Sequence, residues 1–95
     1  MTQSQTRKVL VVEDNELNMR LFCDLLDAYG FQTFQCRDGA KAVEIARQEQ
    51  PDLIIMDIQL PHVSGLDLIA QMKADPKLAG VPVLAVTAYA GKGDE

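Results

Sequence analysis

Short apolar runs alternate along this chain with longer stretches of helical periodicity. Residues 9–12 and 53–56 are continuous apolar runs, typical of strands buried on both faces of a sheet. Residues 31–36 alternate with polar glutamines, which favours an edge strand, and residues 81–86 form a fourth apolar run. Strands that alternate with helices through short turns predict an α/β fold built on a doubly wound parallel sheet.

The segments between the runs carry apolar residues at helical spacing. The first stripe, which we expect to pack on the sheet, consists of Leu17, Leu21, Leu25 and Tyr29, widened by Phe22 and Leu26. Asn15 is suited to cap the start of this helix, and Gly30 to end it. Asp38 opens a second helix and Ser64 a third. The inward residues predicted for these two helices are Ala42, Val43 and Ala46, and Leu66, Ile69 and Met72.

Length and charge restrict the kind of protein. The 95 residues suffice for one domain, which we place at residues 8–95 after a polar tail at 1–7. Nine basic and 14 acidic residues give a net charge of −5, which argues against nucleic acid or an anionic membrane surface as partner. No apolar run approaches the roughly 20 residues of a membrane span. Cys23 and Cys36 fit neither a metal motif nor a disulfide framework, so we expect a cytoplasmic protein.

Candidate chemistry lies just after the predicted strands, because open parallel sheets bind ligands at the carboxyl ends of their strands. Glu13, Asp14 and Asp57 occupy such positions, and three adjacent carboxylates repel one another unless a cation is present. Oxygen ligands without nearby His or Cys favour Mg²⁺, which a phosphate commonly completes. The Thr87 hydroxyl and the Ala88 amide follow the fourth strand and can donate to phosphoryl oxygens. The sequence therefore predicts a site that binds Mg²⁺ and a phosphoryl group.

Four motifs also carry a family resemblance. They are Lys-Val-Leu-Val-Val-Glu-Asp-Asn at 8–15, Pro-Asp-Leu-Ile-Ile-Met-Asp at 51–57, Leu60-Pro61 with Gly65, and Pro-Val-Leu-Ala-Val-Thr-Ala at 82–88. As a set they resemble the receiver domains of response regulators in bacterial two-component signalling. Residues 13–19 and 91–95 are further similar to a single-domain branch of that family, which acts in cell-cycle and polarity control.

The resemblance implies roles for the residues of the predicted site. Asp57 would be the phosphoacceptor, which attacks the phosphohistidine of a histidine kinase or histidine phosphotransferase. Asp14 and Asp57 would bind Mg²⁺ directly together with the backbone carbonyl of Gln59, and Glu13 would act mainly through a metal-bound water. Such a protein is not an enzyme but a signalling component that acts on a downstream protein target.

Residues beyond this metal set also match positions of the family. Thr87 is similar to its switch hydroxyl and Ala88 to a position that is kept small for access. Gln59 and Tyr89 flank the site where the family tunes the lifetime of the acyl phosphate. The resemblance further implies that the phosphodonor docks on the first helix, whose polar residues are Glu16, Arg20, Asp24 and Asp27.

The resemblance departs from the family at the C-terminal end. Receiver domains carry a lysine after a fifth strand, whereas this sequence stops at Glu95, and Lys92 follows Thr87 too closely to replace that lysine. We therefore expect a flavodoxin-like receiver fold that lacks its last helix, strand and helix. The strand at Val83–Val86 would then have an open edge, through which we expect self-association or marginal stability.

Two alternatives remain at this point. The chain could be a truncated or pseudo-receiver that binds partners without being phosphorylated, which the absent lysine supports. It could also be a phosphatase of the haloacid dehalogenase type, with an aspartyl nucleophile. That family has a second aspartate two residues after the first, where this sequence has Gln59.

Overall fold

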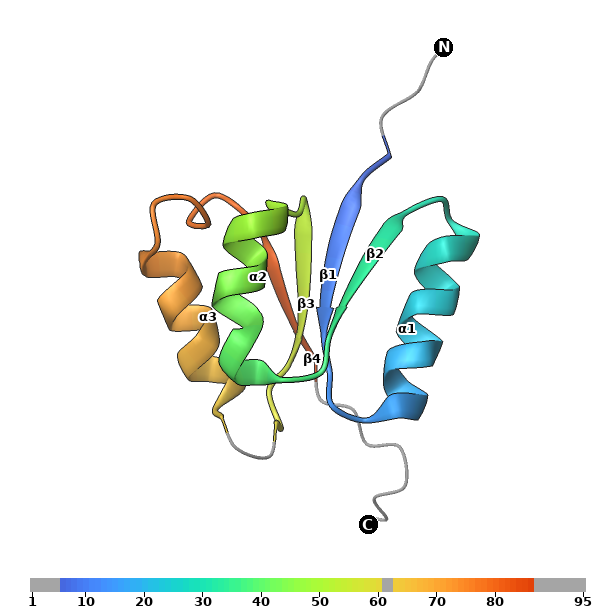
Figure 1. Ribbon diagram of the computed structural model, residues 1–95, viewed down its shortest axis with the longest axis horizontal. Coiled ribbons are helices and arrows are strands. Elements are labelled where there is room, and N and C mark those ends of the chain that lie inside the picture. The colour runs from blue at the N-terminus through green and yellow to red at the C-terminus, as the bar shows by residue number, and fades with distance from the viewer. Residues whose placement is uncertain (1–5, 61–62, 87–95) are drawn as a thin grey trace.

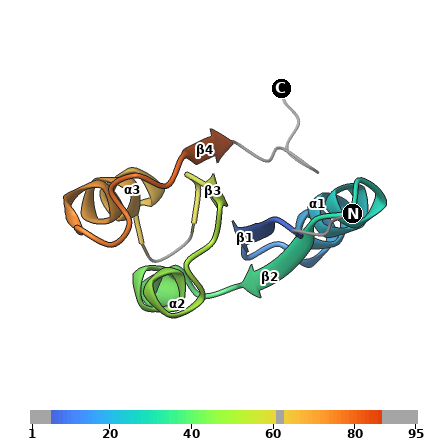
Figure 2. The same cartoon turned by 90° about the horizontal axis from the view of Figure 1, so that it is seen from above.

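A four-stranded parallel sheet forms the centre of the protein, in a computed structural model that describes residues 6–60 and 63–86. The strand order is β2-β1-β3-β4, and the strands are β1 (Lys8–Val12), β2 (Gln32–Cys36), β3 (Leu53–Asp57) and β4 (Val83–Val86). Helix α1 (Glu16–Ala28) lies on one face of the sheet, and helices α2 (Ala42–Glu49) and α3 (Gly65–Ala74) cover the other (Figures 1 and 2). The predicted doubly wound parallel sheet is confirmed, with β2 as one edge strand.

The two apolar runs form the interior strands. Residues 9–12 of β1 are at most 1% exposed, because β2 and β3 flank this strand and helices cover both of its faces. The larger core lies between the sheet and helices α2 and α3, and its fully buried side chains include Leu10, Met56, Ala46 and Met72. The smaller core on the other face joins Val11 and Ile55 of the sheet to α1.

The predicted caps of α1 are present. The Asn15 side chain accepts a hydrogen bond from the Asn18 N–H at 3.0 Å and so satisfies one free donor of the first turn. At the other end Gly30 has a φ of +88°, a left-handed conformation that glycine adopts without strain. These caps fix the start of α1 directly after β1.

The prediction that the first stripe packs on the sheet is wrong for its four main residues and holds only for Phe22 and Leu26, which widen it. Leu17, Leu21 and Leu25 are 57–58% exposed, and Tyr29 is 75% exposed. The core with the sheet is instead formed by the adjacent sector of the helix, which consists of Met19, Phe22, Cys23 and Leu26. A smaller error concerns α3, where Leu66 is 62% exposed and Leu68 takes the core position. The periodicity showed which residues share one side of a helix, but it did not show whether that side faces the sheet or the solvent.

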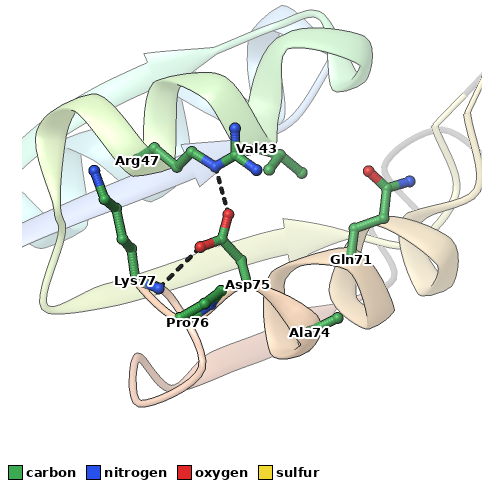
Figure 3. A pocket seen from close by; sticks show the side chains of 7 residues that line it. All are labelled: Val43, Arg47, Gln71, Ala74, Asp75, Pro76 and Lys77. Carbon is green, nitrogen blue, oxygen red and sulfur yellow. Dashed lines mark hydrogen bonds and ion pairs between the residues drawn. The ribbon is translucent and has the colours of Figure 1, made fainter.

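Side-chain bonds hold the start of the segment from α3 to β4 against the last turn of α2. The guanidinium of Arg47, in the last turn of α2, is bonded to the carboxylate of Asp75, which caps the end of α3 (Figure 3). This arginine holds the pKa of Asp75 below its ordinary value. The same carboxylate accepts from the Lys77 N–H at 2.9 Å, and Leu78 is fully buried. A shallow groove of about 670 Å³ lies beside this bond.

Among the residues that the structure describes, no helix is long and apolar enough to cross a membrane.

Candidate metal centre

The three predicted carboxylates meet at the carboxyl ends of β1 and β3. Glu13 and Asp14 follow β1 directly, and Asp57 is the last residue of β3. These two strands are parallel neighbours, with Val12 paired to Met56. The segments that follow them therefore leave the sheet at the same edge. One oxygen from each carboxylate lies within 4.8 Å of the other two. Strand order therefore places three acidic groups, distant in sequence, around one point.

Burial distinguishes these carboxylates. Glu13 is 1% exposed and Asp57 is 3% exposed, whereas Asp14 is exposed to solvent. The Glu13 N–H donates to the Cys36 carbonyl at 3.0 Å, which continues the ladder between β1 and β2 past the last residue of β1. That backbone bond holds the Glu13 side chain at the sheet edge, beside Asp57.

Glu13 is electrostatically strained. Its Oε2 accepts from the Asn15 N–H at 3.2 Å, but its Oε1 is buried and has no hydrogen-bond donor among the described residues. Burial is the largest cause that raises the pKa of Glu13, to about 7, followed by its contact with the Asp57 carboxyl and by repulsion from Asp57 and Asp14. The Asn15 N–H acts in the opposite direction. Near neutral pH the Glu13 carboxyl therefore tends to keep its proton when no cation is bound.

A divalent cation would offset both the repulsion among the carboxylates and the burial of the Glu13 oxygen that has no donor. A buried carboxylate oxygen without a donor is unfavourable, and either a proton or a metal ion satisfies it. Among the described residues, the candidate side-chain ligands at this point are carboxylate oxygens, which suit Mg²⁺ better than the softer transition metals do. The residues present thus fit a hard cation on the chemistry of the donor set.

The backbone beyond β3 orients Asp57. The Gln59 N–H donates to Oδ1 of Asp57 at 2.9 Å, and the Ile58 N–H donates to the Val86 carbonyl at 3.0 Å. One carboxylate oxygen is therefore held by the chain, and the strand end is anchored to β4. Thr87 and Ala88, which were predicted to complete the site, lie outside the described residues, as does Tyr89. The last residue before them, Val86, is paired with Asp57.

Gly65 supports the site in a way that the sequence analysis missed. A Cβ at this first residue of α3 would lie 2.4 Å from the Ile58 Cα and 2.6 Å from the Asp57 carbonyl oxygen. Such distances are far below van der Waals contact, so only glycine lets α3 start against the strand end that carries Asp57. The available signal was a glycine directly after the capping Ser64.

Comparison with known proteins defines the class of protein. A family model of the response regulator receiver domain matches residues 9–94, and the chain belongs to this family. Among curated relatives it is similar to the polar-differentiation response regulator DivK of Brucella ovis and that of Brucella suis. Each is 56% identical over 90 residues, which cover 95% of this chain and 73% of the relative.

Solved structures agree with this assignment. The receiver domain of the sensor histidine kinase PA1611 from Pseudomonas aeruginosa, with a magnesium ion coordinated in its active site cleft, is 32% identical with a TM-score of 0.83. The match covers 95% of this chain and 74% of that one. The phosphorylated cyanobacterial phytochrome response regulator RcpA is 31% identical with a TM-score of 0.75, over 87% of this chain and 66% of that one.

Proposed function

We propose that this receiver accepts a phosphoryl group on Asp57 from a histidine kinase or histidine phosphotransferase, in the presence of Mg²⁺. The observation that carries the proposal is the position of Asp57 at the end of an interior strand, 3% exposed, with the carboxylates of Glu13 and Asp14 beside it. Similarity to a receiver whose structure contains magnesium in its cleft supports the choice of ion.

The residues proposed to hold the ion are Asp14, Asp57 and the backbone carbonyl of Gln59, with Glu13 acting through a metal-bound water. The buried Oε1 of Glu13, without a donor among the described groups, supports a cation at this point. When bound, Mg²⁺ would offset the negative charge of the carboxylates and of the phosphoryl group that approaches them.

The chain itself supplies the acceptor for the transfer. A carboxylate oxygen of Asp57 forms a bond to phosphorus while the P–N bond of the donor phosphohistidine breaks, and the electron pair stays on the imidazole nitrogen, which then takes up a proton. The Gln59 N–H holds Oδ1 of Asp57 and so limits rotation of the carboxylate during the attack. The Thr87 hydroxyl and the Ala88 amide are proposed to donate to the phosphoryl oxygens.

The proposed docking surface for the phosphodonor is the polar flank of α1. This flank lines a groove of about 320 Å³ together with Thr33, Gln35 and Arg37 of the β2 side, and its own charged residues are Glu16, Arg20, Asp24 and Asp27. The groove lies along the helix that begins directly after Glu13 and Asp14, so a donor bound there is near the carboxylates.

The biological role is proposed from similarity. Because relatives at 56% identity are polar-differentiation regulators, we place this chain in bacterial cell-cycle and polarity control, in the cytoplasm, where it signals by binding a downstream protein and not as an enzyme. Among the described residues β4 is an edge strand of the sheet, and its outer side stays a predicted site of self-association.

Intact-mass spectrometry tests the phosphoacceptor. We expect acetyl phosphate with Mg²⁺ to add the mass of one phosphoryl group to the protein, and EDTA to prevent it. Asp57→Asn should abolish the addition, whereas Asp67→Asn, which removes an exposed carboxylate on α3, should leave it unchanged. Labelling of folded Asp57→Asn would contradict the assignment. A folded wild-type protein that never gains mass would favour a receiver that binds partners without phosphorylation.

Charge reversal tests the docking surface. Arg20→Glu should slow transfer from the cognate phosphodonor protein and leave labelling by acetyl phosphate intact, because Arg20 lies in the groove but outside the carboxylate cluster. Lys77→Glu makes the same change of charge in a different groove and should affect neither donor. Equal loss with both donors in Arg20→Glu would contradict docking on α1.

A further inference from the structure

The turn that follows β2 is in close contact with the connection between β3 and α3. Gly39, the first residue of the short 3₁₀ helix Gly39–Lys41, is buried. A Cβ added to it would lie 2.8 Å from Cδ1 of Leu60, 3.3 Å from Cδ1 of Leu68 and 3.4 Å from Cβ of Val63. Leu60 and Val63 lie between β3 and α3, so the segment that follows β3 fills the place of the missing side chain.

The backbone of Gly39 does not itself require glycine. Among the glycines that the structure describes, Gly30 has a positive φ and Gly39 does not, so alanine could adopt the conformation at position 39 without strain. The obstacle is the Leu60 methyl group at 2.8 Å, because carbon atoms in contact are about 3.5–4.0 Å apart. The absence of a side chain at position 39 therefore gives Leu60 its place.

Leu60 directly follows a residue that orients Asp57. The Gln59 N–H donates to Oδ1 of Asp57 at 2.9 Å. The Gln59 carbonyl belongs to the planar peptide group that joins Gln59 to Leu60, so any restraint on Leu60 also limits the direction of that carbonyl. Gln59 is thus held from two sides, by the bond to Asp57 and by the packed side chain of Leu60.

The turn after β2 is itself well anchored. The strands β2, β1 and β3 run parallel, so this turn and the one after β3 lie at the same edge of the sheet (Figure 1). The Cys36 carbonyl accepts from the Glu13 N–H at 3.0 Å, and the Cys36 thiol donates to the Asp38 carbonyl at 3.1 Å. The Asp38 carboxylate accepts from the Ala40 N–H at 3.0 Å and caps the 3₁₀ helix. The turn therefore offers Leu60 a fixed surface, and it also holds the backbone of Glu13.

We propose that Gly39 is a positioning residue of the metal centre. Its missing side chain leaves the space in which Leu60 packs, and Leu60 in turn fixes the backbone of Gln59. This inference rests on the proposed function, in which the Gln59 carbonyl holds Mg²⁺. An alanine at position 39 displaces only a methyl group at the end of a flexible side chain, whereas at Gly65 backbone lies in the way. The fold therefore tolerates Gly39→Ala, but Gln59 loses its second restraint.

Titration calorimetry of the metal-free protein with Mg²⁺ tests the proposal. Gly39→Ala should bind Mg²⁺ about tenfold more weakly than the wild type, as when a group that orients a metal ligand is lost. Its melting temperature should stay within about 4 °C of the wild type. Gly80→Ala, whose added Cβ has no heavy atom within 4 Å, is the matched control and should change neither quantity. Equal affinity in Gly39→Ala and the wild type would contradict the proposal.

A double-mutant cycle tests whether Gly39 acts through Leu60. Leu60→Ala removes the anchoring side chain, so it should weaken Mg²⁺ binding by about as much as Gly39→Ala. It also makes room for a Cβ at position 39, so Gly39→Ala should have no further effect in the Leu60→Ala protein. If the two losses add, Gly39 does not act through Leu60 and the proposal is wrong. Circular dichroism checks that each variant is folded.

Hydrogen exchange of the metal-free protein gives a measurement that needs no Mg²⁺. Nuclear magnetic resonance follows exchange of the Gln59 N–H, which its bond to Asp57 slows. Gly39→Ala should speed this exchange at least about fivefold, and Gly80→Ala should not. A wild type that binds no Mg²⁺ would refute the proposed function, whereas unchanged Gln59 exchange in folded Gly39→Ala would overturn this inference. If Gly39→Ala does not fold, the same increase is expected in Leu60→Ala, and its absence there is equally decisive.

Discussion

The contact between Gly65 and the strand end beneath it can be tested by adding a single methyl group. In Gly65→Ala, the new Cβ would lie 2.4 Å from the Ile58 Cα and 2.6 Å from the Asp57 carbonyl oxygen. Carbon atoms in contact are separated by about 3.5–4.0 Å, so either the start of α3 or the end of β3 must move by about 1 Å. The obstacle is backbone, which cannot rotate away as a side chain does.

The size of the effect follows from two opposing contributions. Overpacking of this kind costs about 3 kcal/mol when backbone has to move, and the better helix propensity of alanine returns about 1 kcal/mol. The net loss in the free energy of unfolding is therefore about 2 kcal/mol. For a domain of this size we expect the melting temperature to fall by about 10 °C.

Gly80→Ala provides the matched control. Gly80 has no heavy atom within 4 Å of an added Cβ and does not require a positive φ, so alanine should change stability by less than about 0.5 kcal/mol. Thermal and urea unfolding, followed by circular dichroism, compare the two variants with the wild type. Magnesium affinity of Gly65→Ala should fall as well, because the strain acts on the residue that carries the Asp57 carboxylate. If Gly65→Ala has the same melting temperature as Gly80→Ala and the wild type, the proposed role of this contact is wrong.

Three further predictions concern stability. In EDTA, the free energy of unfolding should fall by about 3 kcal/mol between pH 4.5 and about 7, because folded Glu13 keeps its proton up to a pKa of about 7 whereas the unfolded residue loses it near 4.5. Glu13→Gln should remove this part of the pH dependence in urea titrations, and an unchanged profile would contradict the strain assigned to Glu13. Asn15→Ala should destabilise the protein by about 1 kcal/mol, measured by urea unfolding, because the first turn of α1 loses its cap. Met72→Ala should cost about 3 kcal/mol in the same assay, because Met72 is fully buried and alanine leaves a cavity; a loss below 1 kcal/mol would argue against a rigid core there.

Sequence patterns predicted most of the fold because each depended on a local rule. The buried strands at β1 and β3, the edge position of β2 and the caps at Asn15 and Ser64 follow from composition or from single side chains. The stripe on α1 could not be placed in this way. Leu17 and Leu21 mark an apolar sector, but the strand order and the width of the sheet decide that Met19 and Cys23 face inward.

The candidate site, too, has features that the sequence could predict and features that it could not. Parallel strands end at one edge of a sheet, so the meeting of Glu13, Asp14 and Asp57 could be predicted from their positions after the strands. The raised pKa of Glu13 could not, because it depends on how deeply that residue is buried and on the lack of a donor for one oxygen. The role of Gly65 needed coordinates, since it concerns the distance between two backbones.

The bond between Arg47 and Asp75 has a consequence for the segment that follows it. Residues 75–81 contain no strand, yet the Asp75 carboxylate fixes the backbone of Lys77, and Leu78 is fully buried. Trypsin cuts after lysine only where several residues can become extended in its cleft, so cleavage after Lys77 requires that the core first release Leu78. The rate of that cut would therefore report how often the large core opens. It would also test whether the connection to α3 holds β4, the edge strand of the sheet among the described residues, in place.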